Sequence, residues 1–235
     1  AGDVACMVAI NDLGTRVVIG APLTDGNGDM SGHARVYEWN GISWIQLGQD
    51  IDGNLEDRFG YSVDISGTGN RIIVSGILND DNGTDAGNAK VYDWNGTSWI
   101  QLGQAVYGLS AGDKAGWTVN ISDDGNRVAV STRSEVNGIP LTGSGYVQIL
   151  YWSGTNWVQL GQIINIPNLV NSMSINSNCN RIVIGTGMQS SVYNWDGTSW
   201  SQMGQTIDRE EVYPTNNSFA ISVDINDSGD RIALS

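Results

Sequence analysis

The sequence is short of basic residues, and this shortage excludes some partners. Lysine and arginine number 11 against 25 aspartates and glutamates in 235 residues, which gives a formal net charge of −14. Such a chain repels phosphate backbones and anionic surfaces, so we expect no nucleic-acid partner. No run approaches the roughly 18 consecutive apolar residues of a membrane span, so we also expect no membrane insertion.

Cysteine, histidine and proline are also scarce. Cys6 and Cys179 are too few for a disulfide framework and lack metal-ligand spacing. The single histidine, His33, has no recognisable nucleophile beside it, and no zinc spacing or phosphate loop is present. The acidic pairs Glu56/Asp57 and Glu210/Glu211 suit solvated loops better than acid–base chemistry. We therefore expect no catalytic residues and predict that the chain is not an enzyme.

A tryptophan-rich stretch occurs four times. VYEWNGISWIQLGQ at 36–49 returns with small changes at 91–104, 149–162 and 192–205. An Asn-Gly, Ser-Gly or Asp-Gly pair at its centre supplies the positive-φ positions of a tight hairpin turn. Eight of the nine tryptophans lie in these hairpins, as the pairs Trp39/Trp44, Trp94/Trp99, Trp152/Trp157 and Trp195/Trp200. The chain is therefore a repeat protein.

A second stretch precedes each tryptophan hairpin and also occurs once more near residue 231. It reads VAINDLGTRVVIG at 8–20, and its aligned arginines are Arg16, Arg71, Arg127, Arg181 and Arg231. Alternating and then continuous apolar residues predict two more antiparallel strands. Four of the five turns carry glycine at one position, which predicts a positive φ. Cys179 takes that place in the fourth turn, where we expect an altered turn rather than a reactive thiol.

Two hairpins per period give four strands in 50–56 residues, with no helical periodicity. That is the size of one blade of a β-propeller, so we predict an all-β propeller of four-stranded antiparallel blades. The predicted units of this single repeat domain (1–235) are 1–56, 57–112, 113–167, 168–216 and the half unit 217–235. Both ends fall on the same half of a blade, so we expect a fragment of a larger ring, with the rest of its own longer chain as a partner.

Short motifs in the first two units resemble a known family. FGYSVDIS at 59–66, followed by RIIVSG, and VVIGAP at 17–22 resemble the FG-GAP repeats of integrin-type propellers. The whole chain also resembles the Trp-rich propeller-like repeats of large secreted and cell-surface proteins. The resemblance implies an extracellular or cell-surface location. FG-GAP blades usually carry an Asp-rich calcium loop between their first two strands, but the turns in this chain read SGTGN or SDDGN, so that calcium site does not transfer.

Two other loops are candidate calcium sites. Oxygen-bearing side chains alternate or cluster around glycine in DGNGD and DDNGTD, as calcium loops require. The candidate ligands are Asp25, Asn27 and Asp29 in the first loop and Asp80, Asp81 and Asp85 in the second. The same residues are also ordinary in exposed turns, and that alternative stays open.

The second tryptophans of the pairs are a candidate ligand platform, on which sugar rings would stack: Trp44, Trp99, Trp157 and Trp200. The favoured alternative is structural. In it, Trp39 and its equivalents pack between blades, while Trp44 and its equivalents brace the outer hairpin.

Taken together, the sequence predicts a non-catalytic extracellular structural or adhesive module with protein or glycan partners. One alternative is a carbohydrate- or protein-binding propeller that uses the face with the variable loops, and another is an accessory propeller of a larger secreted enzyme. Asn95 and Asn82 are candidate glycosylation sites, because each opens an Asn-x-Ser/Thr triplet.

Overall fold

The regular structure of the chain consists entirely of β-strands. The computed structural model describes residues 7–136, 139–140, 145–187, 189–208 and 222–235. Throughout these ranges the assigned elements are strands, and no helix in them is long and apolar enough to cross a membrane. The predicted all-β class is confirmed.

Four antiparallel sheets repeat one plan. An inner strand pairs with a second, the second with a third, and the third with an outer strand. A short fifth strand also pairs with the third strand. The first two sheets contain β1 (Met7–Ile10), β2 (Arg16–Ala21), β3 (His33–Trp39), β4 (Trp44–Gln46) and β5 (Ile51–Asp52), then β6 (Phe59–Ile65), β7 (Arg71–Gly76), β8 (Asn88–Trp94), β9 (Trp99–Gln101) and β10 (Val106–Tyr107). The next two contain β11 (Val119–Ile121), β12 (Arg127–Ser131), β15 (Gly145–Trp152), β16 (Trp157–Gln159) and β17 (Ile164–Ile166), then β18 (Ser172–Ile175), β19 (Arg181–Gly185), β20 (Gln189–Trp195), β21 (Trp200–Gln202) and β22 (Ile207–Asp208).

Two further hairpins complete the described structure. β23 (Val223–Ile225) and β24 (Ile232–Leu234) repeat the first two strands of a blade, and β13 (Glu135–Val136) pairs with β14 (Ile139–Pro140) in the loop after β12. The four-stranded blade predicted from the repeats is therefore present, with one short strand added to each.

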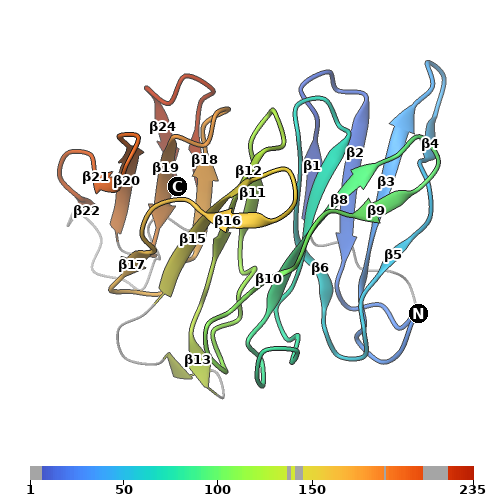
Figure 1. The fold of residues 1–235 in the computed structure, drawn as a ribbon, viewed down its shortest axis with the longest axis horizontal. Coiled ribbons are helices and arrows are strands. Elements are labelled where there is room, and N and C mark those ends of the chain that lie inside the picture. Colours follow the sequence, from blue (N-terminus) through green and yellow to red (C-terminus); the bar gives the residue numbers. More distant parts are fainter. Residues whose placement is uncertain (1–6, 137–138, 141–144, 188, 209–221) are drawn as a thin grey trace.

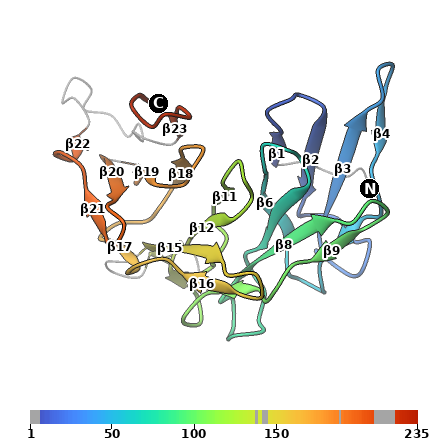
Figure 2. The same cartoon turned by 45° about the horizontal axis from the view of Figure 1, so that its top comes forward.

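The sheets stand side by side around a common axis and form an arc (Figures 1 and 2). The inner strands contact one another in the order β1, β6, β11, β18 and β23. Backbone hydrogen bonds join the turns of successive inner hairpins, from Gly67 N to Asp123 O at 3.0 Å and from Asp123 N to Ser177 O at 2.9 Å. This is the arrangement of propeller blades.

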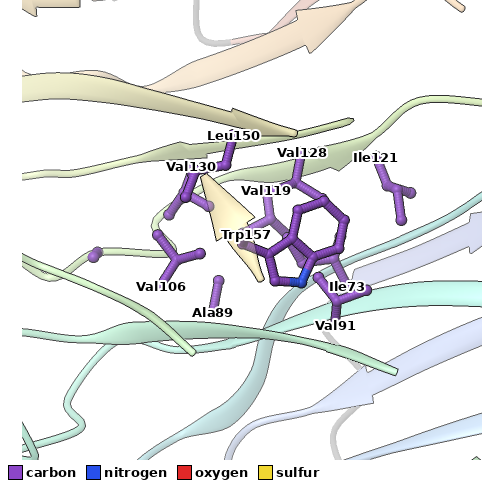
Figure 3. Close-up of a cluster of buried hydrophobic side chains, with 11 residues drawn as sticks. Ile73, Ala89, Val91, Val106, Val119, Ile121, Val128, Val130, Leu150 and Trp157 are labelled. Atoms are coloured by element: carbon purple, nitrogen blue, oxygen red, sulfur yellow. The ribbon is translucent and has the colours of Figure 1, made fainter. Parts of the chain in front are cut away.

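Each hydrophobic core lies between two consecutive blades rather than within one. In Figure 3, Trp157 of the third blade lies among Ile73 and Val91 of the second and Val119 and Val128 of its own. Equivalent clusters join the first blade to the second and the third to the fourth. Since apolar burial drives folding, each blade depends on its neighbours for stability.

The repeated arginines also join neighbouring blades. Arg71 forms an ion pair with Asp93 of its own blade at 3.1 Å and donates a hydrogen bond to Gly125 O in the next blade at 2.9 Å. Arg16 and Arg181 make the same bonds to the carbonyl groups of Gly69 and Gly229. The repeated arginine of the inner hairpin therefore joins two neighbouring blades.

Cys179 keeps the turn of its glycine equivalents, so the altered turn that the sequence predicts is absent. Its φ is +45°, and its N–H donates to Asn176 O at 2.8 Å, as Gly125 N–H donates to Ser122 O. The thiol is fully buried, and burial raises its pKa to about 12. Because the thiolate is the nucleophilic form, this cysteine is inert in the folded protein.

Polar side chains on the inner strands bond to the next blade. Ser62 Oγ accepts a hydrogen bond from Val119 N–H at 3.1 Å, and Asp64 Oδ2 accepts one from Ile121 N–H at 2.9 Å. Removal from water nevertheless raises the pKa of Asp64 to about 6, against an ordinary value of 3.8. Desolvation and the nearby carboxylates of Asp12 and Asp227 also raise the pKa of Asp123.

The raised pKa of Asp64 predicts a specific dependence of stability on pH. A carboxyl group that holds its proton more tightly when folded stabilises the fold near pH 4 and loses that contribution as the pH rises through about 6. The full pKa shift would correspond to a change of ~3 kcal/mol in the free energy of unfolding. We expect a change of about 1–2 kcal/mol, because the Asp64 side chain keeps some contact with water.

Urea unfolding at several pH values tests this prediction with Asp64→Asn. Relative to this variant, the wild-type protein should lose stability between pH 4 and pH 6.5 and change little above pH 7. Parallel stability curves for the two proteins over that range would show that the carboxyl titrates as it does in water.

Candidate functional site

The tryptophan pairs of the repeat form the joints between blades. The two rings of each pair lie 5.3–5.6 Å apart across the outer hairpin. The second indole donates its N–H to a leucine carbonyl of the preceding blade, from Trp99 to Leu47 O at 2.9 Å and from Trp157 to Leu102 O at 2.8 Å. The first tryptophan also packs on the preceding blade, as Trp94 does against Gly48, so both rings of a pair contact the neighbouring blade and the second adds the hydrogen bond.

A glutamine completes each joint. Gln104 Nε2 donates to Trp157 O at 2.6 Å, and Trp157 N–H donates back to Gln104 Oε1 at 3.1 Å. Gln49 and Gln162 hold Trp99 and Trp200 in the same way. The Leu-Gly-Gln at the end of each repeated stretch is therefore the part that receives the tryptophan of the following blade.

The burial of the second tryptophans rules out most of the predicted ligand platform. Trp99, Trp157 and Trp200 are 2%, 3% and 4% exposed, so they cannot present a ring face to a ligand. Trp44 is 44% exposed because no described blade precedes its own. Of the four predicted platform residues, three are structural.

The side chains of the acidic loops stabilise the turns in which they lie. Asp25 Oδ1 accepts a hydrogen bond from Met30 N–H at 3.0 Å, and Asp80 Oδ1 accepts one from Asp85 N–H at 2.8 Å. Asn27 Nδ2 likewise donates to Gly53 O at 3.0 Å, which ties its loop to the link that follows. These side chains close turns, which is the alternative that the sequence left open.

The acidic residues do not converge as a calcium site would. Asp80 and Asp85 line a cavity of about 100 Å³ with Glu56 and Asp57. In the described part of the chain, however, no three His, Cys, Asp or Glu side chains are grouped so that they could hold one metal ion. Calcium needs six to eight oxygen ligands, and calcium binding at Asp25, Asn27, Asp29, Asp80, Asp81 and Asp85 stays a prediction.

The remaining predicted residues lie apart from one another. Asn95 is exposed at a hairpin tip, and Asn82 is exposed while its amide donates to Gly108 O. His33 is buried in β3, where Nδ1 lies 2.8 Å from Thr24 Oγ1. Glu210 and Glu211 lie outside the described residues. Among the described residues, Asn82, Asn95 and His33 do not share a site.

A different group of side chains meets at the start of the inner strands. The rings of Tyr61 and Trp117 lie 5.0 Å apart, and the guanidinium of Arg133 lies 4.3 Å from the centre of the Trp117 ring. Arg133 also donates to Asn171 Oδ1 at 3.4 Å. We call Tyr61, Trp117, Arg133 and Asn171 the axial cluster, because they belong to the ends of neighbouring inner strands or to the loop beside them.

Local backbone geometry places this cluster. The pairing of β6 with β7 shifts register between Phe59 and Val63, which is a bulge that contains Tyr61. Gly116 has a φ of +92°, and both it and Trp117 donate their N–H groups to Ser131 O at 2.9 and 3.3 Å. Bulges re-aim side chains and are frequent beside functional sites.

The axial cluster lies at the end of the arc that carries the variable loops. The link from each outer strand enters the inner strand at this end, and the loop with β13 projects from the same end, at the bottom of Figure 1. Loops held by a rigid scaffold are the usual place for binding residues. The axial cluster therefore lies on rigid strands and is surrounded by loops that vary between blades.

The chemistry of the cluster suits recognition of a ligand. All four side chains are half-buried, and Arg133 brings a positive charge to a chain of net charge −14. A guanidinium stacked on an indole is a recurrent element of ligand-recognition sites. Tryptophan, tyrosine and arginine are the residues most enriched where binding energy concentrates.

One signal in the sequence could have found this site. Trp117 is the one tryptophan of nine that lies outside the repeated hairpins. The corresponding position holds Tyr61 in the second unit and Asn171 in the fourth, so it varies where the hairpin tryptophans repeat. A structural role would recur in each blade, whereas a site is expected to differ between blades.

Comparison with known proteins agrees with the repeat and the fold. Residues 50–92, which run from just before β5 into β8, match the FG-GAP repeat. The curated proteins contain no match to this chain. Residues 50–92 include the Phe-Gly that opens the second blade, as the resemblance in the sequence indicated.

Solved structures share the architecture at low sequence identity. The Pseudomonas aeruginosa periplasmic gluconolactonase has a TM-score of 0.63 at 13% identity, over 97% of this chain and 64% of that one. A candidate 6-phosphogluconolactonase from Bacteroides uniformis has a TM-score of 0.60 at 10% identity, over 88% and 55%. The Dos1 propeller has a TM-score of 0.58 at 13% identity, over 98% and 51%.

These similarities define the class of the protein. The chain is a β-propeller, and it spans between about half and two thirds of the length of the propellers it matches. Residues 50–92 of the chain match the FG-GAP repeat. Identities of this size show a common fold and leave the activity of this chain open.

The expectation that the chain is not an enzyme is wrong. Two of the structures that share its fold are named for lactonase activity, at 13% and 10% identity. Propellers assemble catalytic groups from several blades, so a missing linear motif does not exclude catalysis. Local sequence motifs cannot reveal a site whose residues come from several blades.

Proposed function

We propose that the chain is a carbohydrate-binding propeller module of an extracellular or cell-surface protein, and that the axial cluster is its binding site. The observation that carries the proposal is the stack of Tyr61, Trp117 and Arg133 at the loop-bearing end of the axis. Aromatic rings offer flat apolar surface to the C–H faces of sugars, and polar groups beside the rings orient such ligands.

Three other observations support this function. Trp99, Trp157 and Trp200 are buried inside the blade joints. Two fold neighbours are named for lactones of sugar acids, so this fold accommodates sugar-derived ligands in other proteins. The acidic, lysine-poor composition suits a surface module that must remain soluble beside glycans.

Screening on a glycan array tests the proposal, with neutral and uronic-acid-containing oligosaccharides and titration calorimetry of the best binder. Trp117→Ala should weaken binding more than tenfold, since it removes the central ring. Trp44→Ala is the matched control and should bind as the wild type does, because Trp44 is exposed at a different edge. Absence of binding to every glycan, or equal loss in both variants, would refute the proposal.

Hydrolysis of sugar lactones is a second candidate function, favoured by the two lactonase-named neighbours. Acid release from glucono-δ-lactone, followed at constant pH above the spontaneous rate, measures it directly. A rate that Trp117→Ala abolishes would place turnover at the axial cluster. A rate equal to the spontaneous one would leave binding as the function of this site.

A further inference from the structure

A pocket of about 100 Å³ lies where the fourth blade faces the third. It is bounded by β17 of the third blade and by β19, β20 and β21 of the fourth, at the left of Figure 1. Its apolar wall includes Ile166, Ile184 and Tyr193. The polar residues that line it are all neutral: Asn168, Thr186, Gln189, Ser191, Gln202 and Thr206. Among the described residues that line the pocket, it therefore offers hydroxyl and amide groups beside an apolar surface.

A short side chain opens this pocket where the other blades carry longer ones. The position of Ser191 is held in the first three blades by Arg35, Lys90 and Gln148. Gln148 crosses the joint between the second and third blades, and its Nε2 donates to Tyr107 O at 3.0 Å. Ser191 Oγ instead lies 3.4 Å from Thr206 Oγ1 of its own blade. The space that a long side chain fills in the preceding joint is therefore left open between the third and fourth blades.

The loop beside the pocket is also short. Of the four loops that join the second and third strands of a blade, the one from β19 to β20 is the shortest. In the second blade the longer loop reaches the preceding link, where Asn79 Nδ2 donates to Asp57 Oδ1 at 3.0 Å. In the fourth blade Thr186 N–H donates to Gln189 O at 2.9 Å. The short loop therefore closes on itself, and Thr186 becomes part of the pocket lining.

The polar groups of the pocket suit the hydroxyl groups of a ligand. Gln202 Nε2 donates to Thr206 Oγ1 at 3.1 Å, and Thr206 Oγ1 lies 3.4 Å from Ser191 Oγ. Each hydroxyl can donate one hydrogen bond and accept two, so this group can bind a ligand hydroxyl in either sense. A charged ligand would lose water without meeting an opposite charge in the pocket lining, which is costly. The lining therefore favours a neutral hydroxylated ligand.

We propose that this pocket binds the hydroxymethyl end of a neutral hexose. Its volume exceeds the roughly 30 Å³ share of one water molecule and is below the roughly 150 Å³ of a cavity that holds benzene. The hydroxymethyl arm and the adjoining ring atoms therefore enter it, while the rest of the sugar stays in solvent. Tyr193 and Ile166 offer apolar surface to the sugar C–H groups. The pocket shares no residue with the axial cluster, so this inference does not depend on the function proposed for that cluster.

Methyl NMR of the full chain, labelled at the isoleucine δ1 methyl groups, tests the proposal with the methyl glycosides of glucose, galactose and mannose. The preferred glycoside should shift the Ile166 and Ile184 resonances in a saturable way. The resonance of Ile73, which lies in the joint between the second and third blades, should stay in place. Ser191→Gln fills the space with the side chain of the third blade and should weaken binding about tenfold, because the added side chain competes with the ligand.

Two further variants keep the outcome decisive. Thr206→Val keeps the shape of the side chain but removes its hydroxyl, and it should weaken binding about threefold to tenfold even if Ser191→Gln disturbs the joint. Ser201→Gln is the matched control and should bind as the wild type does, because Ser201 is exposed on the same outer strand. The proposal is overturned if no glycoside shifts the Ile166 and Ile184 resonances in a saturable way, which would leave the pocket to water. It is also overturned if Ser191→Gln and Thr206→Val both keep the wild-type affinity.

Discussion

Replacing Trp157 with alanine is expected to destabilise the protein by about 3–5 kcal/mol, which is the cost of deleting a large buried aromatic side chain. Trp157 is 3% exposed and lies at the centre of the core between the second and third blades (Figure 3). The change also removes the indole donor to Leu102 O. A buried carbonyl without a partner adds to the loss.

The matched control for this prediction is Trp44→Ala. Trp44 has the same place in its hairpin but is 44% exposed, so we expect a cost below about 1 kcal/mol. Urea unfolding followed by circular dichroism measures both variants. Equal losses would mean that the joint between blades contributes little and that each tryptophan acts only within its own hairpin.

Gly116→Ala is expected to be nearly as damaging, at about 3–5 kcal/mol. A Cβ at this position would lie 2.3 Å from Ser75 Cβ and 2.7 Å from Asn88 O, both of the second blade. The φ of +92° adds strain for any L-residue with a side chain. Relief of the overlap requires the second and third blades to separate, which moves Trp117 away from Tyr61.

Gly154→Ala separates the two causes of this loss. Its φ is +97°, close to that of Gly116, but a Cβ there would meet no atom within 4 Å. We expect this variant to lose only about 1–2 kcal/mol, from backbone strain. Thermal unfolding of both variants gives the comparison, and a Gly116→Ala protein as stable as Gly154→Ala would show that the joint tolerates the added methyl group.

The fold could be predicted because its determinants are local and repeated. The hairpin around Asn95 and Gly96 can be recognised from neighbouring residues alone, and it forms as expected, with Asn95 Oδ1 accepting from Ser98 N–H at 2.9 Å. The glycine position before Arg71 and Arg127 correctly marks a positive φ, which even Cys179 adopts. Five near-copies of one pattern make such local evidence decisive.

The joints and the axial cluster could not be predicted in the same way. Gln49 and Trp99 bond across 50 positions of the sequence, and no local pattern shows that the end of one repeat receives the middle of the next. Trp117 lies just before β11 and Arg133 just after β12 of the third blade, whereas Asn171 precedes β18 of the fourth blade. Arg133 therefore reaches Asn171 only across the joint between two blades. The repeated residues therefore predict the scaffold of the propeller. The residues that differ between repeats mark the candidate site.

The central claim is that the repeated tryptophans hold the blades together and the one non-repeating tryptophan binds ligand. Fluorine NMR of the 5-fluorotryptophan-labelled chain tests it, with resonances assigned by single Trp→Phe variants. When the best-binding glycan is added, the Trp117 resonance should shift and the eight hairpin resonances should stay in place. A shift at Trp44, Trp99, Trp157 or Trp200 with an unchanged Trp117 would contradict the account.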